Sequence, residues 1–296
     1  MTTSLQSNSG DLMFQTNLLA NEVVFITGGG TGLGRAMAER MGALGAKVAV
    51  VGRREDPLRE TVEAINAAGG TAAWARCDVR DPQSVAAAVD AIEAALGPVT
   101  ALVNNAAGNF LACAEDLSAN AFDAVVKIVL HGSFHCTSEL GRRWIARGTK
   151  GQVLSIVTTY AWTGSAFVLP SACAKAGVLV MTKSLAVEWA TYGIRLNAIA
   201  PGPFPTEGAF SRLMPADAHD EALRQVPLGR FGEPGELANL ASYLLSPMNA
   251  WMTGECVTLD GGEVLKAGQE FSRMTDYPRD ELRAGLAMLR PSKSAK

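Results

Sequence analysis

A glycine-rich segment near the N-terminus has the residue types that bind phosphate groups. The sequence TGGGTGLG, from Thr27 to Gly34, lies between a short apolar run, VVFIT, and a helix expected near 32–44. Glycine lets the backbone turn tightly and approach a ligand closely, and the N-terminus of the helix offers free N–H groups and a positive dipole. A strand, a glycine-rich turn and a helix in this order are typical of a dinucleotide site, and an ordinary turn is the alternative interpretation.

Two adjacent arginines follow the second apolar run, where dinucleotide-binding folds distinguish NAD from NADP. The run VAVVG leads into Arg53 and Arg54, and no acidic residue stands at the turn to hold a ribose 2′-hydroxyl. A guanidinium pairs with phosphate through a planar fork of donors, so these residues favour NADPH. The alternative interpretation is a solvated basic turn. Asp78, at the end of the third run, is placed to contact the adenine.

The elements expected to position these residues alternate between short apolar runs and helical patterns. Runs rich in Val, Ile and Ala without polar alternation are typical of parallel strands that are buried on both faces. The pattern predicts an α/β protein with a single Rossmann-like, doubly wound parallel sheet of about seven strands and helices on both faces. The expected strands are VVFIT, KVAVVG, TAAWARCDV, TALVNNA, QVLSIVTT, RLNAIAPG and CVTLDGG, with helices near 32–44, 56–68, 121–147 and 174–192.

The chain divides into one domain with two tails. Residues 1–20 are rich in Ser, Thr, Asn and Gln and are expected to form a flexible N-terminal arm. Residues 21–262 contain the alternating pattern, and a single α/β domain of this size is common. Residues 263–296 are expected to form a C-terminal extension with one helix near Asp280 to Leu289.

Composition argues against several classes of function. A net charge of −3 provides no electrostatic basis for binding nucleic acid. No apolar stretch has the eighteen or so residues that a membrane span requires, so no membrane association is expected. The first basic residue is Arg35, whereas targeting presequences need positive charge, which favours a cytoplasmic location. The five cysteines are scattered and form no CxxC pair, which fits a reducing compartment without a zinc site.

Four motifs together resemble the short-chain dehydrogenase/reductase family over roughly Leu18 to Gly262. They are TGxxxGxG at Thr27, NNA ending at Ala106, PG at Pro201 and DGG at Asp260. The resemblance implies a nicotinamide dinucleotide as cofactor and a homotetramer built through the long central helices. The residues expected to contact the cofactor are Thr27, Gly28, Gly30, Thr31, Gly32, Leu33, Gly34, Arg53, Arg54, Asp78, Val79, Asn105, Ala106, Lys175, Pro201, Gly202, Pro203 and Phe204.

The catalytic motif of that family is broken in this chain. The usual YxxxK has a tyrosine that protonates a carbonyl oxygen and a lysine that lowers its pKa, but Lys175 is preceded by Ser171 in SACAK. A serine hydroxyl is too weak an acid near neutrality, so either the enzyme is inactive or another residue replaces the tyrosine. Tyr160, at the end of the fifth expected strand, is the candidate. Alternate strand residues face the same side, so Thr158 and Tyr160 are both expected to face the site, and a plain packing role for Tyr160 is the alternative.

Longer stretches of the chain are similar to the mitochondrial type of 2,4-dienoyl-CoA reductase, which also has serine in place of that tyrosine. They are NNAAGNF, TTYAWTGSAFVLPSACAKAG and EWATYGIRLNAIAPGP followed by GAFSRL. The resemblance implies that Tyr160 and Asn109 hold the thioester carbonyl, that Lys175 binds the nicotinamide ribose and that Ser171 supports the site. It also implies that acyl-CoA contacts Arg80, Phe110, Ser118, Tyr160 and Arg212.

The activity implied is the NADPH-dependent reduction of 2,4-dienoyl-CoA to 3-enoyl-CoA in the β-oxidation of unsaturated fatty acids, by hydride transfer to the δ carbon. A 2-enoyl-CoA or carbonyl reductase on the same scaffold is one alternative, because fold does not fix chemistry. A catalytically silent NADPH-binding sensor is another, suggested by the broken motif and by His131.

His131 replaces an asparagine that is usual in the long central helix, and it is expected either to act as a polar partner or only to fill space. His135 follows at helical spacing, but with no carboxylate or cysteine ligand evident, no metal is expected.

Overall fold

Seven parallel strands form one sheet, in the order β3-β2-β1-β4-β5-β6-β7, in a computed structural model that describes residues 15–206, 219–268 and 272–288. The strand order reverses between β1 and β4, which is the switch point where doubly wound sheets bind ligands. The predicted fold class is therefore confirmed. The strands are β1 Val23–Thr27, β2 Lys47–Gly52, β3 Thr71–Arg76, β4 Ala101–Asn104, β5 Gly151–Ile156, β6 Ile194–Pro201 and β7 Cys256–Leu259.

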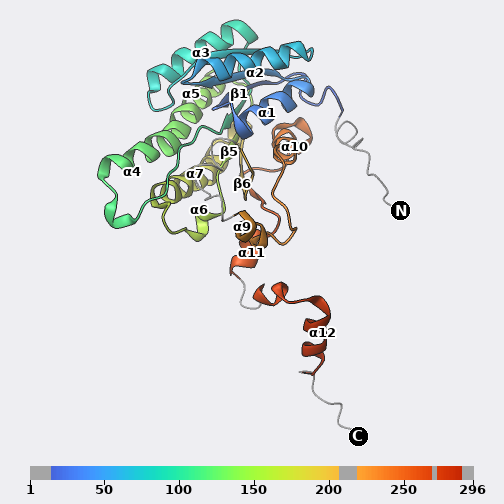
Figure 1. Cartoon of the computed structure of the whole chain (residues 1–296). Helices are drawn as coiled ribbons and strands as arrows, with labels where there is room; N and C mark the ends of the chain where they lie inside the picture. The colour runs from blue at the N-terminus through green and yellow to red at the C-terminus, as the bar shows by residue number, and fades with distance from the viewer. Residues whose placement is uncertain (1–14, 207–218, 269–271, 289–296) are drawn as a thin grey trace.

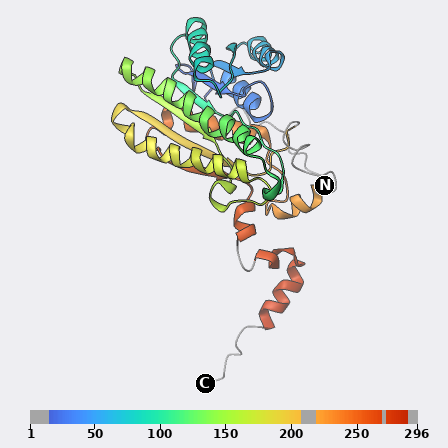
Figure 2. The same ribbon diagram turned by 90° about the vertical axis from the view of Figure 1, so that its left-hand side faces the viewer.

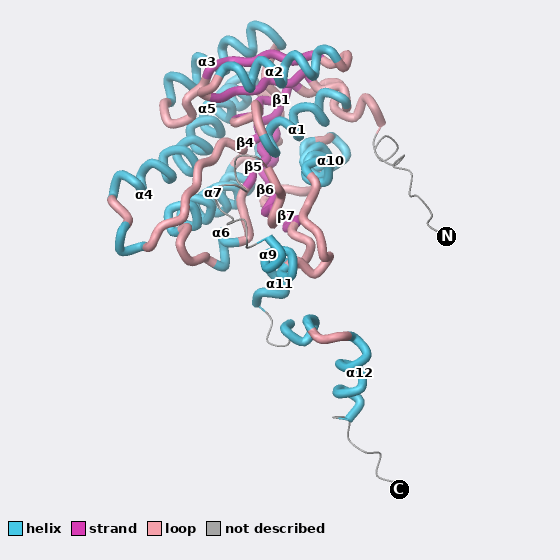
Figure 3. Tube along the Cα trace, viewed as in Figure 1, coloured by secondary structure: helices cyan, strands magenta, loops and turns pink. Residues whose placement is uncertain are grey.

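Helices cover both faces of the sheet, because the strands are apolar on both sides (Figures 1 and 3). One face packs against α1 (Gly32–Ala43), α2 (Glu55–Ala67) and α10 (Pro234–Leu245). The other packs against α3 (Pro82–Leu96), α5 (Gly132–Arg147) and α7 (Leu169–Glu188). The shorter segments are η1 Ala114–Asp116, α4 Ala119–Val126, η2 Lys127–His131, α6 Tyr160–Thr163, η3 Ala190–Tyr192, α9 His219–Gln225, η5 Pro247–Asn249, α11 Glu263–Gly268, η6 Ser272–Asp276 and α12 Arg279–Met288.

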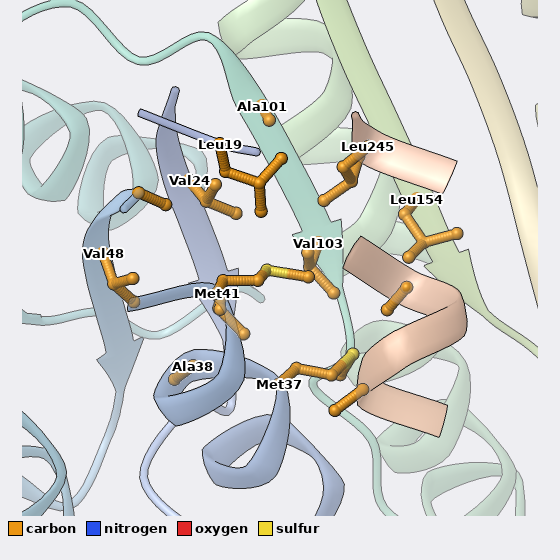
Figure 4. Packing of buried hydrophobic residues seen from close by; sticks show 14 of the residues in the cluster. Leu19, Val24, Met37, Ala38, Met41, Val48, Ala101, Val103, Leu154 and Leu245 are labelled. Atoms are coloured by element: carbon orange, nitrogen blue, oxygen red, sulfur yellow. The ribbon is translucent and has the colours of Figure 1, made fainter. Parts of the chain in front are cut away.

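The core beside α1 reaches back to the segment that precedes the first strand. Figure 4 shows Met37 and Met41 of α1 close to Val103 of β4 and Leu19. Leu19 is fully buried, and its N–H donates to Leu44 O at 2.9 Å. The expectation of a loose arm over 1–20 was therefore wrong at Leu19, because an apolar side chain in a polar segment was enough to anchor it. Residues 1–14 of that arm lie outside the described residues.

The long central helix contains a π-helical segment that its sequence did not reveal. The helix begins at Ala119, continues through η2 and α5, and runs beside α7 (Figure 2). A π segment inserts an extra residue into the helical turn and re-aims the side chains around it. His131, the last residue of η2, is exposed, and its ring centroid lies 6.3 Å from that of His135. It therefore does not fill space in the interior.

The chain after the sheet forms more helix than its sequence indicated. The structure places α12 over Arg279–Met288, close to the predicted 280–289, whereas α11 was not predicted. In Figure 1 α12 lies beyond the sheet and its covering helices. Among the described helices, none has both the length and the apolarity needed to cross a membrane.

Glu93 joins α3 to α5 through charged hydrogen bonds. Its carboxylate accepts from both terminal nitrogens of Arg147, at 2.6 and 2.7 Å, and from Arg143 at 3.0 Å. The hydrogen bonds from Arg147 lower the pKa of Glu93 from its ordinary value of 4.5 to about 2. The stabilising effect is therefore complete above pH 4.5 and is lost as the pH falls toward 2.

We expect Glu93→Gln to lower the free energy of unfolding at pH 7 by about 2 kcal/mol, because two arginines lose a charged partner. The free energies of unfolding of the variant and the wild type, measured in urea, should converge as the pH is lowered from 4.5 toward 3. Glu60→Gln is the matched control, since Glu60 is well exposed and its pair with Arg35 spans 3.8 Å; it should change stability by less than about 0.5 kcal/mol. A pH-independent effect of Glu93→Gln would contradict the assignment.

Candidate active site

The carboxyl ends of β1 and β4 are joined by one hydroxyl group. The Thr27 hydroxyl donates to Val103 O at 3.2 Å and accepts from Asn105 N at 3.0 Å and Ala106 N at 2.9 Å. The Asn105 side-chain amide in turn donates to Thr27 O at 3.0 Å and Gly28 O at 3.2 Å. These bonds fix the backbone after β4 against the glycine-rich turn, which brings the TG and NNA motifs together at the switch point.

The glycine-rich turn has no room for side chains at its key positions. Gly28 has a φ of 67°, and a Cβ on Gly34 would lie 2.3 Å from Gly28 O. The α1 N-terminus begins at Gly32 after Thr31, whose side chain makes no capping bond, and the first turn has no acidic residue. Its N–H groups are thus open to a ligand with negative charge, which fits the pyrophosphate of a dinucleotide. Leu33 packs against the core and holds the helix in place.

A group of charged residues lies at the ends of β2 and β3. Arg53 and Arg54 are exposed directly after β2. Asp78 accepts hydrogen bonds from the Arg80 Nε at 2.9 and 3.1 Å, and this contact, helped by the charge of Arg53, lowers the pKa of Asp78. Arg80, which the resemblance assigned to acyl-CoA, is therefore paired with Asp78 beside the expected adenine position.

The backbone of Val79 is anchored to the long central helix. Nδ1 of His135 donates to Val79 O at 2.9 Å, and the Val79 side chain packs where a Cβ on Gly132 would lie, 2.6 Å away. This bond gives His135 a structural partner. Among the described residues there is no group of three or more His, Cys, Asp or Glu side chains placed to hold a metal.

Three side chains from separate segments meet at the hydroxyl of Tyr160, and we call them the hydroxyl cluster. Asn109 Nδ2 donates to the Tyr160 hydroxyl at 3.3 Å, and the Ser171 Oγ lies 3.0 Å from the same oxygen. Asn109 Oδ1 accepts from Phe110 N at 2.9 Å, which turns the amide so that its nitrogen points at Tyr160. Ser171 is 2% exposed, whereas Tyr160 is half-buried, so the phenol is the member open to a ligand. A phenol hydroxyl beside an amide N–H can stabilise negative charge on an oxygen.

The route by which Tyr160 reaches the cluster differs from the one expected. Strand β5 ends at Ile156, and Tyr160 is the first residue of the short helix α6. The alternation argument for Thr158 and Tyr160 was therefore wrong, because neither residue lies in a strand. A turn after the strand, and not the strand pleat, directs the phenol toward Ser171.

Lys175 lies one helical turn after Ser171 in α7, so both side chains lie on the same side of the helix. Its ammonium is buried and donates to the carbonyl oxygen of Ile156, the last residue of β5. Burial lowers the pKa of Lys175 from 10.5 to about 8. The partner was not predicted, because any residue type can supply a backbone carbonyl and the sequence therefore contains no signal for it.

The segment Pro201 to Phe204 begins at the last residue of β6 and is fixed by its backbone. Gly202 N donates to Leu259 O at 3.0 Å, and Pro203 O accepts from Gly232 N at 3.1 Å. The Phe204 ring is buried in the core, so only the backbone at this position is available to a ligand. The structure thus places this segment next to the end of β7 and the DGG motif.

The residues assigned to acyl-CoA are dispersed. Phe110 packs against the buried cluster that contains Val125 and Val129, directly after Asn109. Ser118 is exposed and caps α4 by accepting from Ala121 N at 3.2 Å. Arg212 lies outside the described residues.

One cavity among the described residues lies away from the hydroxyl cluster. It has a volume of about 770 Å³ and is lined by α9, α11 and η6. Lys266, which lines it, already donates to Arg224 O and to Asp276 at 2.7 Å each. Its ammonium is therefore paired, and the residues of the hydroxyl cluster do not line this cavity.

A doubly wound sheet with a glycine-rich turn, a buried lysine and a hydroxyl cluster at its carboxyl edge defines a dinucleotide-binding oxidoreductase fold. A family model described as "Enoyl-(Acyl carrier protein) reductase" matches residues 28–263. The chain belongs to the short-chain dehydrogenase/reductase family of oxidoreductases.

Relatives and solved structures extend the same likeness. The chain is 43% identical over 249 residues to a probable 2,4-dienoyl-CoA reductase of the (2E)-enoyl-CoA-producing type from Bacillus subtilis, covering 83% of this chain and 98% of that one. It is 44% identical over 250 residues to a probable 2,4-dienoyl-CoA reductase of the (3E)-enoyl-CoA-producing type from Caenorhabditis elegans, covering 83% and 81%.

Among solved structures, a short chain dehydrogenase from Bacillus anthracis has a TM-score of 0.76 and 43% identity, covering 82% of this chain and 96% of that one. A putative 2-deoxy-d-gluconate 3-dehydrogenase from Agrobacterium tumefaciens with bound NADP has a TM-score of 0.78 and 31% identity, covering 85% and 100%.

Replacing the Thr27 hydroxyl by a methyl should loosen this edge of the sheet. Thr27→Val leaves two backbone N–H groups without their acceptor, so we expect the free energy of unfolding in urea to fall by about 3 kcal/mol. Thr27→Ser keeps the hydroxyl and should lose about 1 kcal/mol or less. A loss in Thr27→Ser as large as that in Thr27→Val would contradict a dominant role for the hydroxyl, because the serine variant keeps the hydroxyl and removes only the methyl group.

Proposed function

We propose that this protein catalyses the NADPH-dependent reduction of 2,4-dienoyl-CoA esters. The observation that carries the proposal is the hydroxyl cluster: Tyr160 and Asn109 stand together, and Ser171 occupies the position where most of the family has its tyrosine. The names of the relatives from Bacillus subtilis and Caenorhabditis elegans support the same substrate class.

The position of the phenol suits conjugate reduction better than carbonyl reduction. When bound, NADPH would supply a hydride to the δ carbon of the diene. The negative charge then flows through the conjugated system to the thioester oxygen, four carbons from the carbon that was reduced. A ketone reductase instead needs its acid beside the reduced carbon. Moving the donor from position 171 to Tyr160 separates it from the reduced carbon, which suits the longer reach of a dienoyl thioester.

In this scheme Tyr160 and Asn109 donate to the thioester oxygen as an oxyanion-hole pair. Ser171 accepts from the phenol or donates to it and so fixes its direction. Losing one such donor commonly costs about 3 kcal/mol of transition-state stabilisation. Lys175 would hold the nicotinamide ribose, and the backbone of 201–204 would hold the carboxamide.

The position of the product double bond depends on where the dienolate is protonated. Protonation at the α carbon gives a 3-enoyl-CoA, and protonation at the γ carbon gives a 2-enoyl-CoA. The names of the two relatives differ on this point. We propose the 3-enoyl product, with water as the proton donor, because the Tyr160 hydroxyl is engaged at the oxygen end of the substrate.

Parallel assays separate this proposal from its rivals. NADPH oxidation should be fast with trans-2,trans-4-decadienoyl-CoA and slow with 2-decenoyl-CoA and acetoacetyl-CoA. A 2-enoyl-CoA reductase, which the description of the matching family model favours, would instead be fast with decenoyl-CoA. A silent sensor would bind NADPH without turnover of any of the three substrates. Proton NMR of the product made in deuterated water would locate the new C–D bond at the α or the γ carbon.

Tyr160→Phe removes one donor from the thioester oxygen and should lower kcat with decadienoyl-CoA by about 100- to 1000-fold. Tyr192→Phe is the matched control, because Tyr192 lies in η3, directly before β6, at the amino ends of the parallel strands and away from the hydroxyl cluster. The kcat of this variant should not change. Ser171→Tyr should not create an efficient ketoreductase. A loss of less than about threefold in Tyr160→Phe would contradict the assignment of the phenol.

The choice of NADPH over NADH should depend on the arginines after β2. Replacing both Arg53 and Arg54 by Ala should raise the KM for NADPH by about 10- to 100-fold and leave that for NADH nearly unchanged, because charged hydrogen bonds to the 2′-phosphate are lost. Arg59→Ala is the control, since Arg59 lies over the Trp74 ring at 5.9 Å. An equal change for both cofactors would argue against a 2′-phosphate site.

A further inference from the structure

Four large apolar side chains are exposed on the segments that supply the hydroxyl cluster and on the turn that joins two of them, and we call these side chains the apolar rim. Leu111 follows Asn109 by two residues, Trp162 follows Tyr160 by two, and Leu169 precedes Ser171 by two. Phe167 lies in the turn between α6 and α7. The members and their exposed fractions are Leu111 at 50%, Trp162 at 47%, Phe167 at 60% and Leu169 at 43%. Single exposed apolar residues are ordinary, whereas a group around polar ligand-binding groups indicates a binding surface.

Phe167 also has a strained backbone. Its φ of 65° is positive, and among the described residues no other non-glycine residue has a positive φ. A bulky side chain in this conformation is disfavoured, and such residues persist where the surrounding structure holds them. The holding contact is visible, because Phe167 O accepts from Ala112 N at 3.0 Å.

That hydrogen bond joins two arms of the rim. Ala112 directly follows Leu111, so the segment after Asn109 is tied to the turn between α6 and α7. The same turn connects Tyr160, at the start of α6, to Ser171, in the first turn of α7. The strained turn thus presents an exposed aromatic ring beside the three segments that build the hydroxyl cluster.

We propose that the apolar rim is the seat of the acyl chain and that Phe167 is a residue that determines chain-length specificity. The inference rests on the proposed function and names a residue that the sequence did not single out. The occupant is an alkyl chain because the rim is apolar and lies on the segments whose Tyr160 and Asn109 would hold the thioester oxygen. A chain anchored at that oxygen must leave the cluster across neighbouring surface, and each methylene that it buries on an apolar wall favours binding.

The test compares kcat/KM for 2,4-decadienoyl-CoA and 2,4-hexadienoyl-CoA. In Phe167→Ala we expect the ratio of the longer to the shorter substrate to fall about tenfold, mainly through a higher KM for the longer one. Phe167→Tyr keeps the ring and should keep the ratio. Trp251→Ala is the matched control, because Trp251 is 99% exposed and precedes β7 at the opposite edge of the sheet, and it should leave the ratio unchanged.

Phe167→Gly separates the ring from the strained backbone. Glycine adopts a positive φ readily, so this variant should fold at least as well as Phe167→Ala, yet its ratio should fall equally because the ring is missing. A ratio retained in Phe167→Gly but lost in Phe167→Ala would overturn the proposal, since the backbone alone would then be responsible. An unchanged ratio in both variants would overturn it as well, and if their oligomeric state changed instead, the rim would be a contact with a second copy.

A binding measurement tests the apolar rim independently of the proposed reaction. If the wild type does not reduce any dienoyl-CoA, the proposed function fails, and calorimetric titration with saturated decanoyl-CoA and hexanoyl-CoA in the presence of NADP⁺ still tests the rim. A preference for the longer chain that falls about tenfold in Phe167→Ala would support it. Equal affinities for both chains in the wild type would overturn it.

Discussion

The hydroxyl of Tyr160 is where three segments of the chain are held to within hydrogen-bonding distance of one another. Asn109 comes from the loop after β4, Tyr160 from the turn after β5, and Ser171 from the start of α7. Adjacent parallel strands bring the first two segments to the same edge of the sheet, and α7 returns the chain across its face. Small errors in any of these elements would break the cluster, so the register of the sheet and the packing of α7 determine whether the site exists.

The same edge must also leave space for a dinucleotide, and backbone groups define that space. Thr27 fixes the backbone after β4 against the glycine-rich turn, and Gly34 lets the first helix approach Gly28 more closely than any side chain would allow. Lys175 extends from α7 to the carbonyl of Ile156, and it follows Ser171 of the hydroxyl cluster by one helical turn. The site is thus built mainly from main-chain geometry, and a few side chains add the acid–base groups.

Ser171 stands where the family motif has its tyrosine, and the fold around it is that of the family. Ser171 keeps its helical spacing from Lys175, so the lysine and α7 retain their positions in the fold. The phenol instead comes from Tyr160 of α6, and the Asn109 side-chain amide donates to its hydroxyl. The short connection between α6 and α7 contains the strained Phe167. This connection therefore affects both the position of the Tyr160 phenol and the apolar surface that Phe167 exposes.

The sequence by itself determined the sheet and the glycine-rich turn, because apolar runs and glycine spacing are local properties, whereas the cluster residues were predicted from the resemblance of longer stretches to a known family. It predicted α12 within one residue at each end, yet it placed Tyr160 in a strand and residues up to Leu19 in a loose arm. Only the tertiary structure decided that β5 ends at Ile156, that Lys175 bonds to its carbonyl, and that the Asn109 side-chain amide donates to the Tyr160 hydroxyl. Those outcomes depend on backbone partners and on segments distant in sequence, which packing brings together and no local pattern records.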